Sequence, residues 1–365
     1  AYCWSEVAGF SKFGSYTGNG QSTNDGGKVI DVGFSPKFVM VKRTDNSGNW
    51  MIFDAPRNAS QVGSNAGKTP YLRPNLANGE DETGTQCTFS STGFTLGSLN
   101  DVNASGGTYI YAAFAANPGN DWTVNNISAG IALNPTAKQN FDVVTYSGTG
   151  SSQSISSLAF QPDFVWLKAR SAAYGHHLFD SIRGPLKVLH SNGTFAEYNG
   201  PNTLTSFDSD GFTLGSDAAT NNSGQTFVAW AWKAGGAASS NYDGTITSQV
   251  SANASYGFSV VSWTGNQTDG ASVGHGLGSV PKLILAKSRV DGTYEWITLH
   301  ETTGTSSGFS AGNLNTTGTI DDISNSSRKC QSWHQAPTSS VFSLGIDGSS
   351  WNGTLNKSEA YIAYC

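Results

Sequence analysis

The chain is poor in charge and has no cluster of basic residues. Only 13% of its 365 residues are charged, and the formal net charge is −6. No basic cluster is larger than Lys42-Arg43, so the phosphate-neutralising surface that nucleic-acid binding needs is missing. No apolar run approaches the roughly 18 residues of a membrane-spanning helix, and residues 1–4 have neither the basic start nor the apolar core of a signal peptide. We therefore expect no nucleic-acid partner and no membrane insertion.

Cysteine is scarce as well. None of the four cysteines has CxxC or Cys/His metal-ligand spacing, and they stand far apart as Cys3, Cys87, Cys330 and Cys365. They fit buried small apolar side chains, and they also fit a disulfide pair. The sequence leaves both interpretations open.

Glycine, polar turn residues and aromatics are what the chain does have. It contains 44 Gly, and 12% of its residues are aromatic. Aromatic and β-branched side chains suit a pleated surface, whereas Gly and Asn suit tight turns. No helical period extends beyond about ten residues. The composition and pattern therefore predict an all-β fold.

Three groups of motifs recur three times in the same order. The segment GFTLGS at 93–98 returns unchanged at 211–216 and, weakened, at 341–345. An aromatic-rich segment follows each copy, at 108–114, 226–232 and 360–365. Upstream of these lie the Pro-led segments 36–43, 162–170 and 281–289, and before them the segments 14–18, 144–148 and 261–265.

The spacing of these motifs is that of whole domains. Phe94, Phe212 and Phe342 follow one another at roughly 120 residues, against roughly 20–50 for solenoid and propeller repeats. A unit of this size with six to eight short strands suits a β-sandwich. We expect three tandem antiparallel β-sandwich domains of jelly-roll or lectin-like type, at residues 1–116, 117–236 and 237–365. Within each, the apolar run after the Pro, such as 38–41, predicts a central strand buried on both faces.

The two ends of the chain resemble each other. Residues 1–4 match the closing strand of a unit, and they share the tripeptide Ala-Tyr-Cys with residues 363–365. This pattern is expected of a segment of a longer tandem array, or of a strand that pairs into a neighbouring copy. An ordinary edge strand of the first domain is the alternative. Because open strand edges invite association, we expect a homo-oligomer or a longer tandem chain.

Several of these motifs resemble an uncharacterised repeat domain of tailed-phage structural proteins. The resemblance covers essentially the whole chain, and it is carried by residues 2–20, 207–216 and 227–232. That domain occurs in tail-fibre-like and other virion-surface proteins of phages that infect cyanobacteria and other aquatic bacteria. The resemblance implies a virion or extracellular location and a role in adhesion, and it supplies no catalytic residue. The third unit departs from the pattern, with His300 where the other two have an aspartate.

The candidate ligand-binding groups are a repeated carboxylate–guanidinium pair and nearby aromatic and histidine side chains. The pair is interpreted first as a structural salt bridge and alternatively as a cluster that orients a sugar hydroxyl or an anionic glycan. The aromatic side chains near hairpin tips either pack against the next domain or stack on sugar rings. The candidate ligand-binding residues are Trp50, Asp54, Arg57, Tyr174, His176, Asp180, Arg183 and Trp296.

Metal binding and catalysis have weaker support. One patch could suggest a metal site, namely His176 and His177 with Asp180 and Glu197. Adjacent histidines on a strand point to opposite faces, so the two do not readily share one metal. The loops at 100–103 and 217–222 are suited to turns, or to Ca²⁺ through carboxylate and carbonyl oxygens. The acidic cluster 80–82 is expected to be solvated rather than catalytic. We assign no catalytic residue and no metal ligand, and Ca²⁺ is the one cofactor that the loops would suit.

Together these observations predict a virion-surface structural and adhesion protein that contacts host-surface polysaccharide and other virion subunits or copies of itself. Two alternatives stay open. One is a polysaccharide-depolymerising or carbohydrate-binding enzyme module on the same sandwich, which needs two carboxylates in a groove of one unit. The other is a purely architectural fibre or capsid-decoration subunit.

Overall fold

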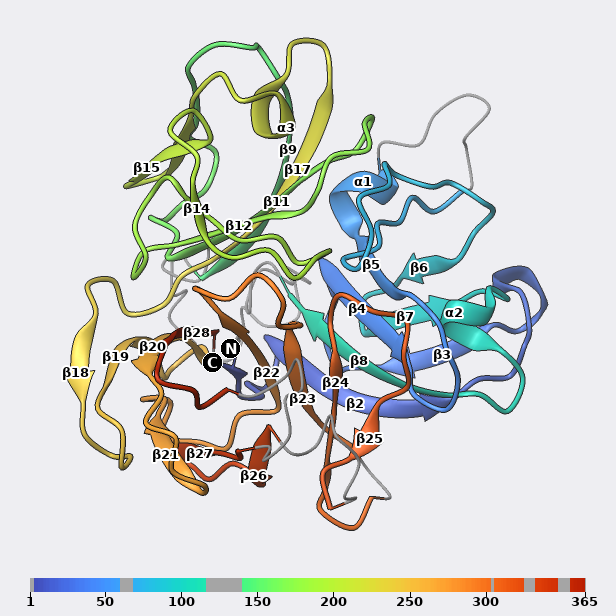
Figure 1. Ribbon diagram of the computed structural model, residues 1–365. Helices are drawn as coiled ribbons and strands as arrows, with labels where there is room; N and C mark the ends of the chain where they lie inside the picture. Colours follow the sequence, from blue (N-terminus) through green and yellow to red (C-terminus); the bar gives the residue numbers. More distant parts are fainter. Residues whose placement is uncertain are drawn as a thin grey trace, which may run out of the picture.

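The computed structural model describes residues 3–59, 68–115, 140–302, 305–324, 332–346 and 355–364. Its regular structure is mainly antiparallel β-strand (Figure 1). The α-helices of these ranges are single turns, and none of them is long and apolar enough to cross a membrane. They are α1 (Ala55–Ala59), α2 (Asn100–Asn103) and α3 (Ala218–Asn221), with the 3-10 turn η1 (Thr23–Asp25). The expected all-β fold is confirmed.

The strands form three pairs of sheets, which we call the first, second and third sheet pairs. Each pair joins a four-stranded set to a three-stranded sheet. The four-stranded sheet of the first pair has the order β2 (Ser11–Thr17), β8 (Thr108–Phe114), β4 (Phe38–Arg43), β5 (Trp50–Asp54). Its three-stranded sheet has the order β3 (Lys28–Asp31), β7 (Gly93–Leu96), β6 (Cys87–Phe89).

The second pair repeats this order. Its four-stranded sheet is β9 (Phe141–Ser147), β17 (Thr226–Trp232), β11 (Phe164–Ala169), β12 (His177–Asp180). Its three-stranded sheet is β10 (Gln153–Ile155), β16 (Gly211–Leu214), β15 (Leu204–Asp208). A small hairpin joins β13 (Lys187–Val188) to β14 (Tyr198–Asn199).

The third pair repeats it again and adds strands at both edges. The four equivalent strands are β20 (Phe258–Thr264), β28 (Ala360–Tyr364), β22 (Leu283–Ser288), β23 (Ile297–Glu301). The added strands are β18 (Ser239–Asn241), β19 (Ser248–Asn253), β24 (Phe309–Asn313) and β25 (Asp321–Asp322). The three-stranded sheet is β21 (Ala271–Gly274), β27 (Val341–Leu344), β26 (Trp333–Gln335).

The Gly-Phe-Thr-Leu motif supplies the middle strand of the first two three-stranded sheets. Its glycine is required by the close approach of the neighbouring strand. A Cβ on Gly93 would lie 2.0 Å from the carbonyl oxygen of Ile30, and one on Gly211 would lie 1.7 Å from that of Ile155. The repeated glycine is therefore explained by backbone contact.

The apolar run after each Pro forms a central strand that is buried on both faces, as predicted. In β4, Val39 and Val41 pack into the core shared with the first three-stranded sheet. Phe38 and Met40 point to the other face and join a larger central cluster. The continuous apolar pattern thus reflects two cores rather than one.

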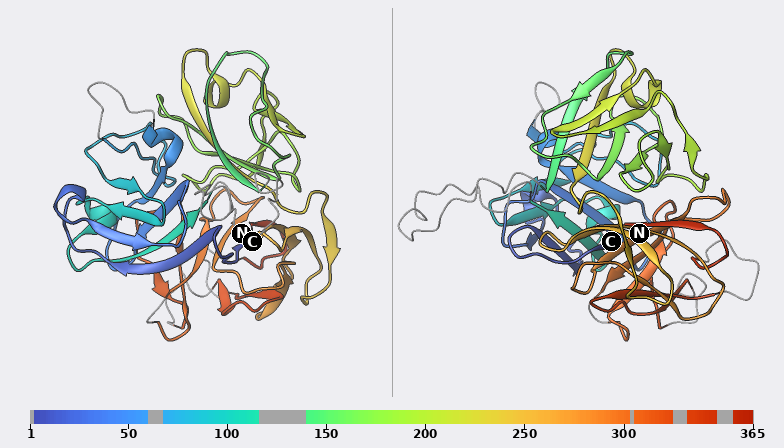
Figure 2. Two further views of the ribbon diagram at one scale, coloured as in Figure 1. Left: turned by 180° about the vertical axis from the view of Figure 1, so that it is seen from behind. Right: turned by 90° about the vertical axis from the view of Figure 1, so that its left-hand side faces the viewer.

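The central cluster draws side chains from all three sheet pairs, which meet in the middle of the molecule (Figures 1 and 2). At its heart lie three rings. The ring centroids of Trp4 and Phe114 are 5.7 Å apart, those of Trp4 and Trp232 are 5.7 Å apart, and those of Phe114 and Trp232 are 5.9 Å apart. Such tilted and edge-on contacts are favourable for aromatic rings. The three sheet pairs are therefore joined through a common core.

Trp4 holds in the third sheet pair the place that Phe114 and Trp232 hold in the other two. Phe114 and Trp232 are the last residues of β8 and β17. In the third pair, the short strand β1 (Cys3–Trp4) lies between β20 and β22, in line with the end of β28. The structure thus places residues 3–4 in the third sheet pair and not at an edge of the first.

Candidate functional site

All the candidate ligand-binding side chains except Tyr174 lie where one sheet pair meets the next, and we call these contact regions the seams. At the first of them, β5 ends at Asp54 and α1 follows. The Asp54 carboxylate accepts from the backbone N–H of Arg57 at 3.0 Å and from its Nε at 2.6 Å. Arg57 also donates through Nη2 to the carbonyl of Ile52 at 3.0 Å. Both charged side chains have 0% exposure, so the pair is a buried ion pair with its hydrogen bonds provided by the protein.

The second sheet pair repeats this arrangement at the end of β12. Asp180 accepts from the backbone N–H of Arg183 at 2.9 Å and forms an ion pair with its Nε. Arg183 Nη2 donates to the carbonyl of Leu178 at 2.9 Å. Burial opposes the ionisation of Arg183, but the charges of Asp180 and Glu197 and the hydrogen bond to Asp180 together outweigh it and raise the pKa of Arg183. The predicted salt bridge is therefore present in both copies.

A side chain from the neighbouring sheet pair completes each of these clusters. Trp230 of β17 donates its Nε1–H to the Asp54 carboxylate at 3.0 Å. Tyr364 of β28 donates its hydroxyl to Asp180 and accepts from Arg183 Nη2 at 2.8 Å. Trp230 and Tyr364 hold the same register position of the closing strand, opposite Trp166 and Leu285. The carboxylate of one pair thus binds the closing strand of the next.

The seam between the third and first pairs lacks the carboxylate. His300 stands where Asp54 and Asp180 stand, and its Nε2 hydrogen-bonds to the carbonyl of Tyr111 at 3.1 Å. The Phe13 ring lies edge-on against His300 with centroids 6.2 Å apart. Burial lowers the pKa of His300, which keeps the imidazole neutral near pH 7.

A second contact recurs at all three seams and closes them into a ring. In each pair, one side chain at the start of β5, or just before β12 or β23, points a ring nitrogen at a backbone carbonyl of the adjoining pair. Trp50 donates to Asn313 at 3.1 Å, and Trp296 donates to His190 at 2.7 Å. His176 Nε2 bonds the carbonyl of Arg73 at 3.0 Å. The first pair therefore contacts the third, the second contacts the first, and the third contacts the second.

His176 is held neutral by its surroundings. The indole of Trp166 donates to His176 Nδ1 at 2.8 Å, so Nδ1 is the acceptor. The proton of the imidazole is therefore on Nε2, which donates it in the hydrogen bond to the backbone carbonyl of Arg73. Burial, followed by the charge of Lys168, lowers the pKa of His176 well below its ordinary value. His177 packs on the other face of β12, with its ring 6.3 Å from that of Phe179. The expected opposite orientation of the two histidines is confirmed.

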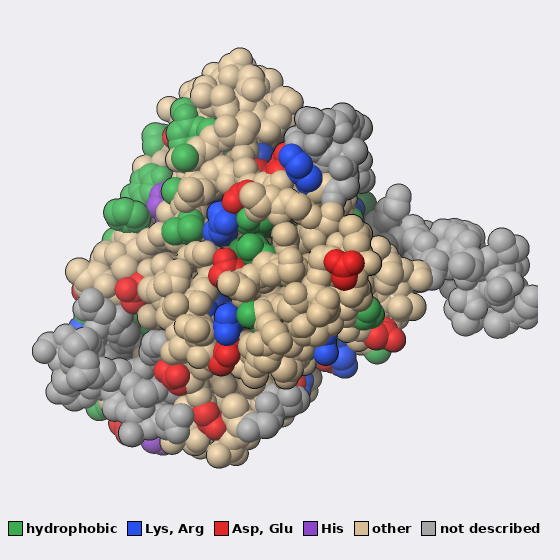
Figure 3. Space-filling view, turned by 90° about the vertical axis from the view of Figure 1, so that its right-hand side faces the viewer, with side chains coloured by type: hydrophobic (Ala, Val, Ile, Leu, Met, Phe, Trp, Pro, Cys, Tyr) green, Lys and Arg blue, Asp and Glu red, His purple; other side chains and the backbone are tan. Residues whose placement is uncertain are grey.

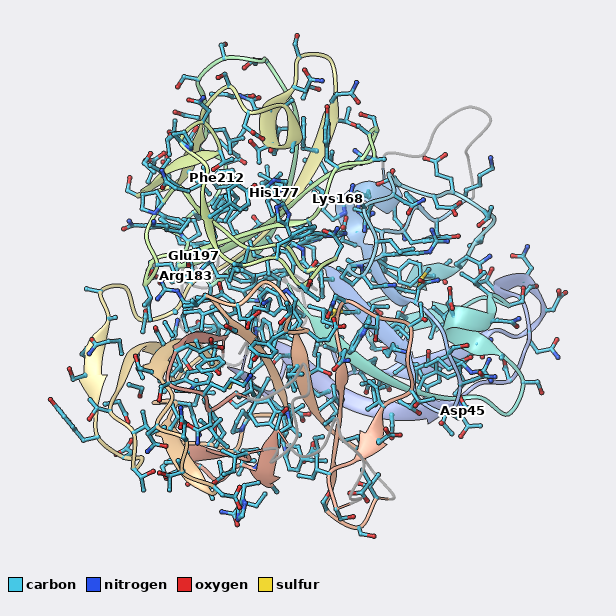
Figure 4. The ribbon with its side chains drawn as sticks, viewed as in Figure 1. Asp45, Lys168, His177, Arg183, Glu197 and Phe212 are labelled. Atoms are coloured by element: carbon cyan, nitrogen blue, oxygen red, sulfur yellow. The ribbon has the colours of Figure 1, made fainter. Side chains whose placement is uncertain are left out.

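Two glutamates strengthen the seams, and the sequence analysis assigned neither of them to a contact between repeats. Glu80 accepts from Arg170 at 2.9 and 3.0 Å and from Arg57 at 3.2 Å. Glu197 accepts from Arg289 at 3.0 Å through both oxygens and from Arg183 at 3.4 Å. Figure 4 shows Arg183 and Glu197 together where the second and third pairs meet.

Glu80 corrects the expectation that the acidic cluster 80–82 is solvated, because its side chain is only 7% exposed. Burial opposes its ionisation, but hydrogen bonds and charge from Arg170 and Arg57 hold the pKa of Glu80 below its ordinary value. In the third seam Ile320 takes this place, and its N–H donates to the carbonyl of Thr44 at 3.3 Å. A glutamate bound by two arginines of different repeats leaves no local signal in the sequence.

Three lysines are buried at equivalent positions, near the end of the central strand of each pair. Lys168 Nζ donates to the carbonyls of Ala169 at 2.6 Å and Ala172 at 3.3 Å. Lys287 makes the corresponding bonds, and Lys42 donates to the carbonyl of Arg43. Burial, followed by the Arg57 charge, lowers the pKa of Lys168 to about 7, and burial lowers that of Lys287 to about 8. These lysines tie down the loops that follow the strands.

The structure distributes the predicted residues over the three seams and does not bring them together in one site. Asp54 and Arg57 belong to the seam of the first and second pairs, while Asp180 and Arg183 belong to that of the second and third. Trp50, His176 and Trp296 are divided among the three seams. Tyr174 is half-buried against the core of the second pair. The partners that the sequence analysis did not identify are Trp230 and Tyr364, which lie in the aromatic-rich segments 226–232 and 360–365.

The loops considered for Ca²⁺ have their carboxylates engaged with the protein. Asp101 accepts from the backbone and side-chain N–H groups of Asn49 at 3.0 and 3.1 Å. Asp217 caps α3 by accepting from Ala219 N at 2.9 Å. Within the ranges that the structure describes, no group of three or more His, Cys, Asp or Glu side chains is arranged to hold a metal ion.

The cysteines differ from one another. Cys3 is disulfide-bonded. Cys87 is free and buried in the core of the first pair, and burial raises the pKa of its thiol. Cys330 and Cys365 lie outside the described residues. Both interpretations left open by the sequence therefore apply, each to a different cysteine.

The surface is mostly uncharged and polar. The face in Figure 3 shows scattered charged side chains of both signs, and hydrophobic side chains gather beside a histidine in its upper left part. A shallow pocket of about 400 Å³ lies over the first seam. It is lined by Arg73, Asn78, Gly79, Glu80, Asp81 and Glu82. Arg73 binds Asp81 at 3.1 Å across it.

Comparison with known proteins gives a family and no function. No curated protein and no solved structure was found to be similar to the chain. One family model, described as a domain of unknown function (DUF7483), matches residues 1–118 and 136–365. Because the match covers most of the sequence, the chain belongs to the DUF7483 family.

Proposed function

We propose that the chain is a structural and adhesion protein of the virion surface or another extracellular surface. In this proposal the three sheet pairs are tandem β-sandwich domains of jelly-roll or lectin-like type, closed into a ring. The observation that carries it is the use of the charged clusters. Asp54, Arg57, Asp180 and Arg183 are each at most 7% exposed, and they bind other repeats rather than facing solvent. Such groups serve assembly, which leaves the polar surface for contact with other molecules.

Two further observations support the location. Disulfides persist in oxidising surroundings outside the cytosol, and Cys3 is disulfide-bonded. The motifs at residues 2–20, 207–216 and 227–232 resemble those of phage tail-fibre-like proteins. On this basis the partners are other virion subunits or further copies of the chain, and the external ligand is a host-surface polysaccharide.

Binding and turnover of polysaccharide test the proposal together. The 365-residue chain is mixed with polysaccharides purified from bacterial surfaces, retention is measured by affinity electrophoresis, and polymer mass is followed by light scattering. The proposal predicts retention without loss of polymer mass. Depolymerisation that a single carboxylate substitution abolishes would show an enzyme instead, and retention by no polysaccharide would remove adhesion from the proposal.

A purely architectural subunit is the second candidate, and the central cluster favours it. Trp4, Phe114 and Trp232 join three sheet pairs into one core, which suits a rigid spacer or decoration protein as well as an adhesin. The two functions differ in one measurement. An architectural subunit binds virion components and is not retained by any surface polysaccharide.

A further inference from the structure

The loop before and within β14 has counterparts in the other two sheet pairs. Asn192 Oδ1 accepts from the backbone N–H of His176 at 2.8 Å. Asn75 does the same for Trp50 at 3.1 Å, and Asn315 does it for Trp296 at 3.0 Å. Five positions further on, Glu80, Glu197 and Ile320 each donate a backbone N–H to the adjoining pair. These contacts align the three loops residue by residue.

Two aromatic side chains distinguish the loop of the second pair. Phe195 is 62% exposed and Tyr198 is 42% exposed. The aligned positions hold Asn78 and Asp81 in the first pair, and Gly318 and Asp321 in the third. The other two loops form their seams without aromatic residues, so neither the fold nor the seam requires exposed rings here. Exposed aromatics without a structural role are a mark of a binding surface.

The two rings are held in place by their surroundings. The His190 ring stacks on Tyr198 with centroids 5.6 Å apart at 18°, and it meets Phe195 edge-on at 6.0 Å. His190 Nδ1 hydrogen-bonds to the carbonyl of His176 at 2.9 Å, which anchors the imidazole between them. The Phe195 ring packs over Gly193, where an added Cβ would lie 2.8 Å from it. The rings are therefore ordered before any ligand arrives, which lowers the entropy cost of binding.

The two carboxylates nearest the patch are both engaged with the protein: the Asp217 charge acts on His190 and Tyr198, and Asp217 accepts from the backbone N–H of Ala219 at 2.9 Å. Glu197, between the two aromatic residues, is bound by Arg289 and Arg183. Val290, which follows Arg289, is 61% exposed and adds apolar surface from the third pair. Burial lowers the pKa of His190, so its imidazole is neutral near pH 7. Apart from Glu197, the polar side chains of loop 191–199 are hydroxyls and amides, which bind neutral hydroxylated ligands.

We propose that Phe195 and Tyr198, held in place by His190, form a platform on which the apolar face of a pyranose ring of a neutral polysaccharide stacks. The inference rests on the proposed adhesion function and names its site and ligand class. Flat apolar rings flanked by neutral hydrogen-bonding groups match a sugar, which has an apolar face and a rim of hydroxyls. A protein partner is disfavoured by size, because a stable interface needs about 800 Å² on each side. Among the residues that the structure describes, the remaining exposed large hydrophobic ones are Val29, Tyr242 and Ile346, in the first and third pairs.

The test uses the chain's own alternative residues. The double variant Phe195→Asn with Tyr198→Asp carries the side chains that the first pair has at these positions. Because the first pair forms its seam with these side chains, we expect the variant loop to form its seam as well. Tyr242→Ala is the control, because Tyr242 is 75% exposed on the third pair. Dextran, mannan and a neutral galactan are the probes, with the acidic polymer alginate as the charged comparison. Affinity electrophoresis gives the dissociation constants.

We expect the wild type and Tyr242→Ala to be retarded by at least one neutral polymer, and the double variant to bind about tenfold more weakly or worse. Unchanged thermal unfolding shows that the variant is folded. Equal retardation of wild type and double variant would overturn the platform and leave adhesion intact. Retardation by alginate alone would overturn the neutral ligand class. No retardation of the wild type by any polymer would overturn both proposals.

Discussion

The contribution of Trp4 to the core is the most demanding prediction about this fold. Residues 3–4 are far in sequence from the strands they join, yet Trp4 is 2% exposed and touches Phe114, Trp232 and Phe258. Substituting Trp4→Ala removes one of the three rings at the centre of the molecule. We expect this substitution to destabilise the third sheet pair first, because β1 pairs with β20 and β22.

The magnitude follows from the buried area. A buried Trp side chain hides roughly 150–250 Å², and at about 25 cal/mol per Å² this corresponds to about 4–6 kcal/mol. Measured Trp→Ala substitutions in cores cost about 3–5 kcal/mol. We therefore expect Trp4→Ala to lower the free energy of unfolding by about 4 kcal/mol. Trp4→Phe is expected to cost less than about 1.5 kcal/mol, because Phe114 fills the equivalent place in the first pair.

Urea unfolding followed by far-UV circular dichroism measures the cost, and amide hydrogen exchange locates it in β20, β22 and β28. Tyr242→Ala is the surface control and should change stability by no more than about 0.5 kcal/mol. A loss below about 1 kcal/mol for Trp4→Ala would refute the reasoning. So would equal losses for the alanine and phenylalanine variants.

Three further predictions concern the seams. Trp230→Phe removes the hydrogen bond to the Asp54 carboxylate, and Tyr364→Phe removes its counterpart at Asp180. Each substitution should lower the free energy of unfolding in urea by about 1.5–3 kcal/mol. A loss of only a few tenths of a kcal/mol would contradict the role given to the buried clusters. Because the pKa of Lys168 is about 7 in the folded state and its ordinary value is 10.5, only the unfolded state binds the proton between these values. The difference in unfolding free energy between the wild type and Lys168→Met should therefore rise from pH 7 to 10.5. A difference that stays constant over this range would contradict the lowered pKa of Lys168. The pKa of His176 is lowered well below 6.5, so the unfolding free energy should fall as the pH drops below 6.5. The fall should be less steep in His176→Gln, and an equal dependence on pH in both proteins would contradict this prediction.

Local pattern was enough to predict the strands, because their signal lies in neighbouring residues. The run Phe38–Val41 indicated a strand buried on both faces, and the structure has it between β8 and β5. The Asp54–Arg57 ion pair was also accessible, since its members are three residues apart and recur as Asp180–Arg183. Repetition and short spacing are what made these features visible.

The seams could not be predicted, because their partners come from different repeats. Trp230 looks like any core residue of an aromatic strand, and its bond to Asp54 spans 176 positions. Glu80 sits in an Asn- and Gly-rich loop whose composition suggests a solvated surface, whereas Arg170 buries it from 90 positions away. Contacts of this kind depend on how whole sheet pairs pack, which no local periodicity encodes. The one hint in the sequence was that Tyr364 and Trp230 occupy the same position of the repeat.

Small-angle X-ray scattering of the 365-residue chain tests most directly whether the three sheet pairs share one core. A compact chain of this length has a radius of gyration of about 21 Å. Three separate units of roughly 120 residues placed end to end would give about 30 Å. The seams and the central rings predict the smaller value for a single chain, and a value near 30 Å would contradict the closed arrangement.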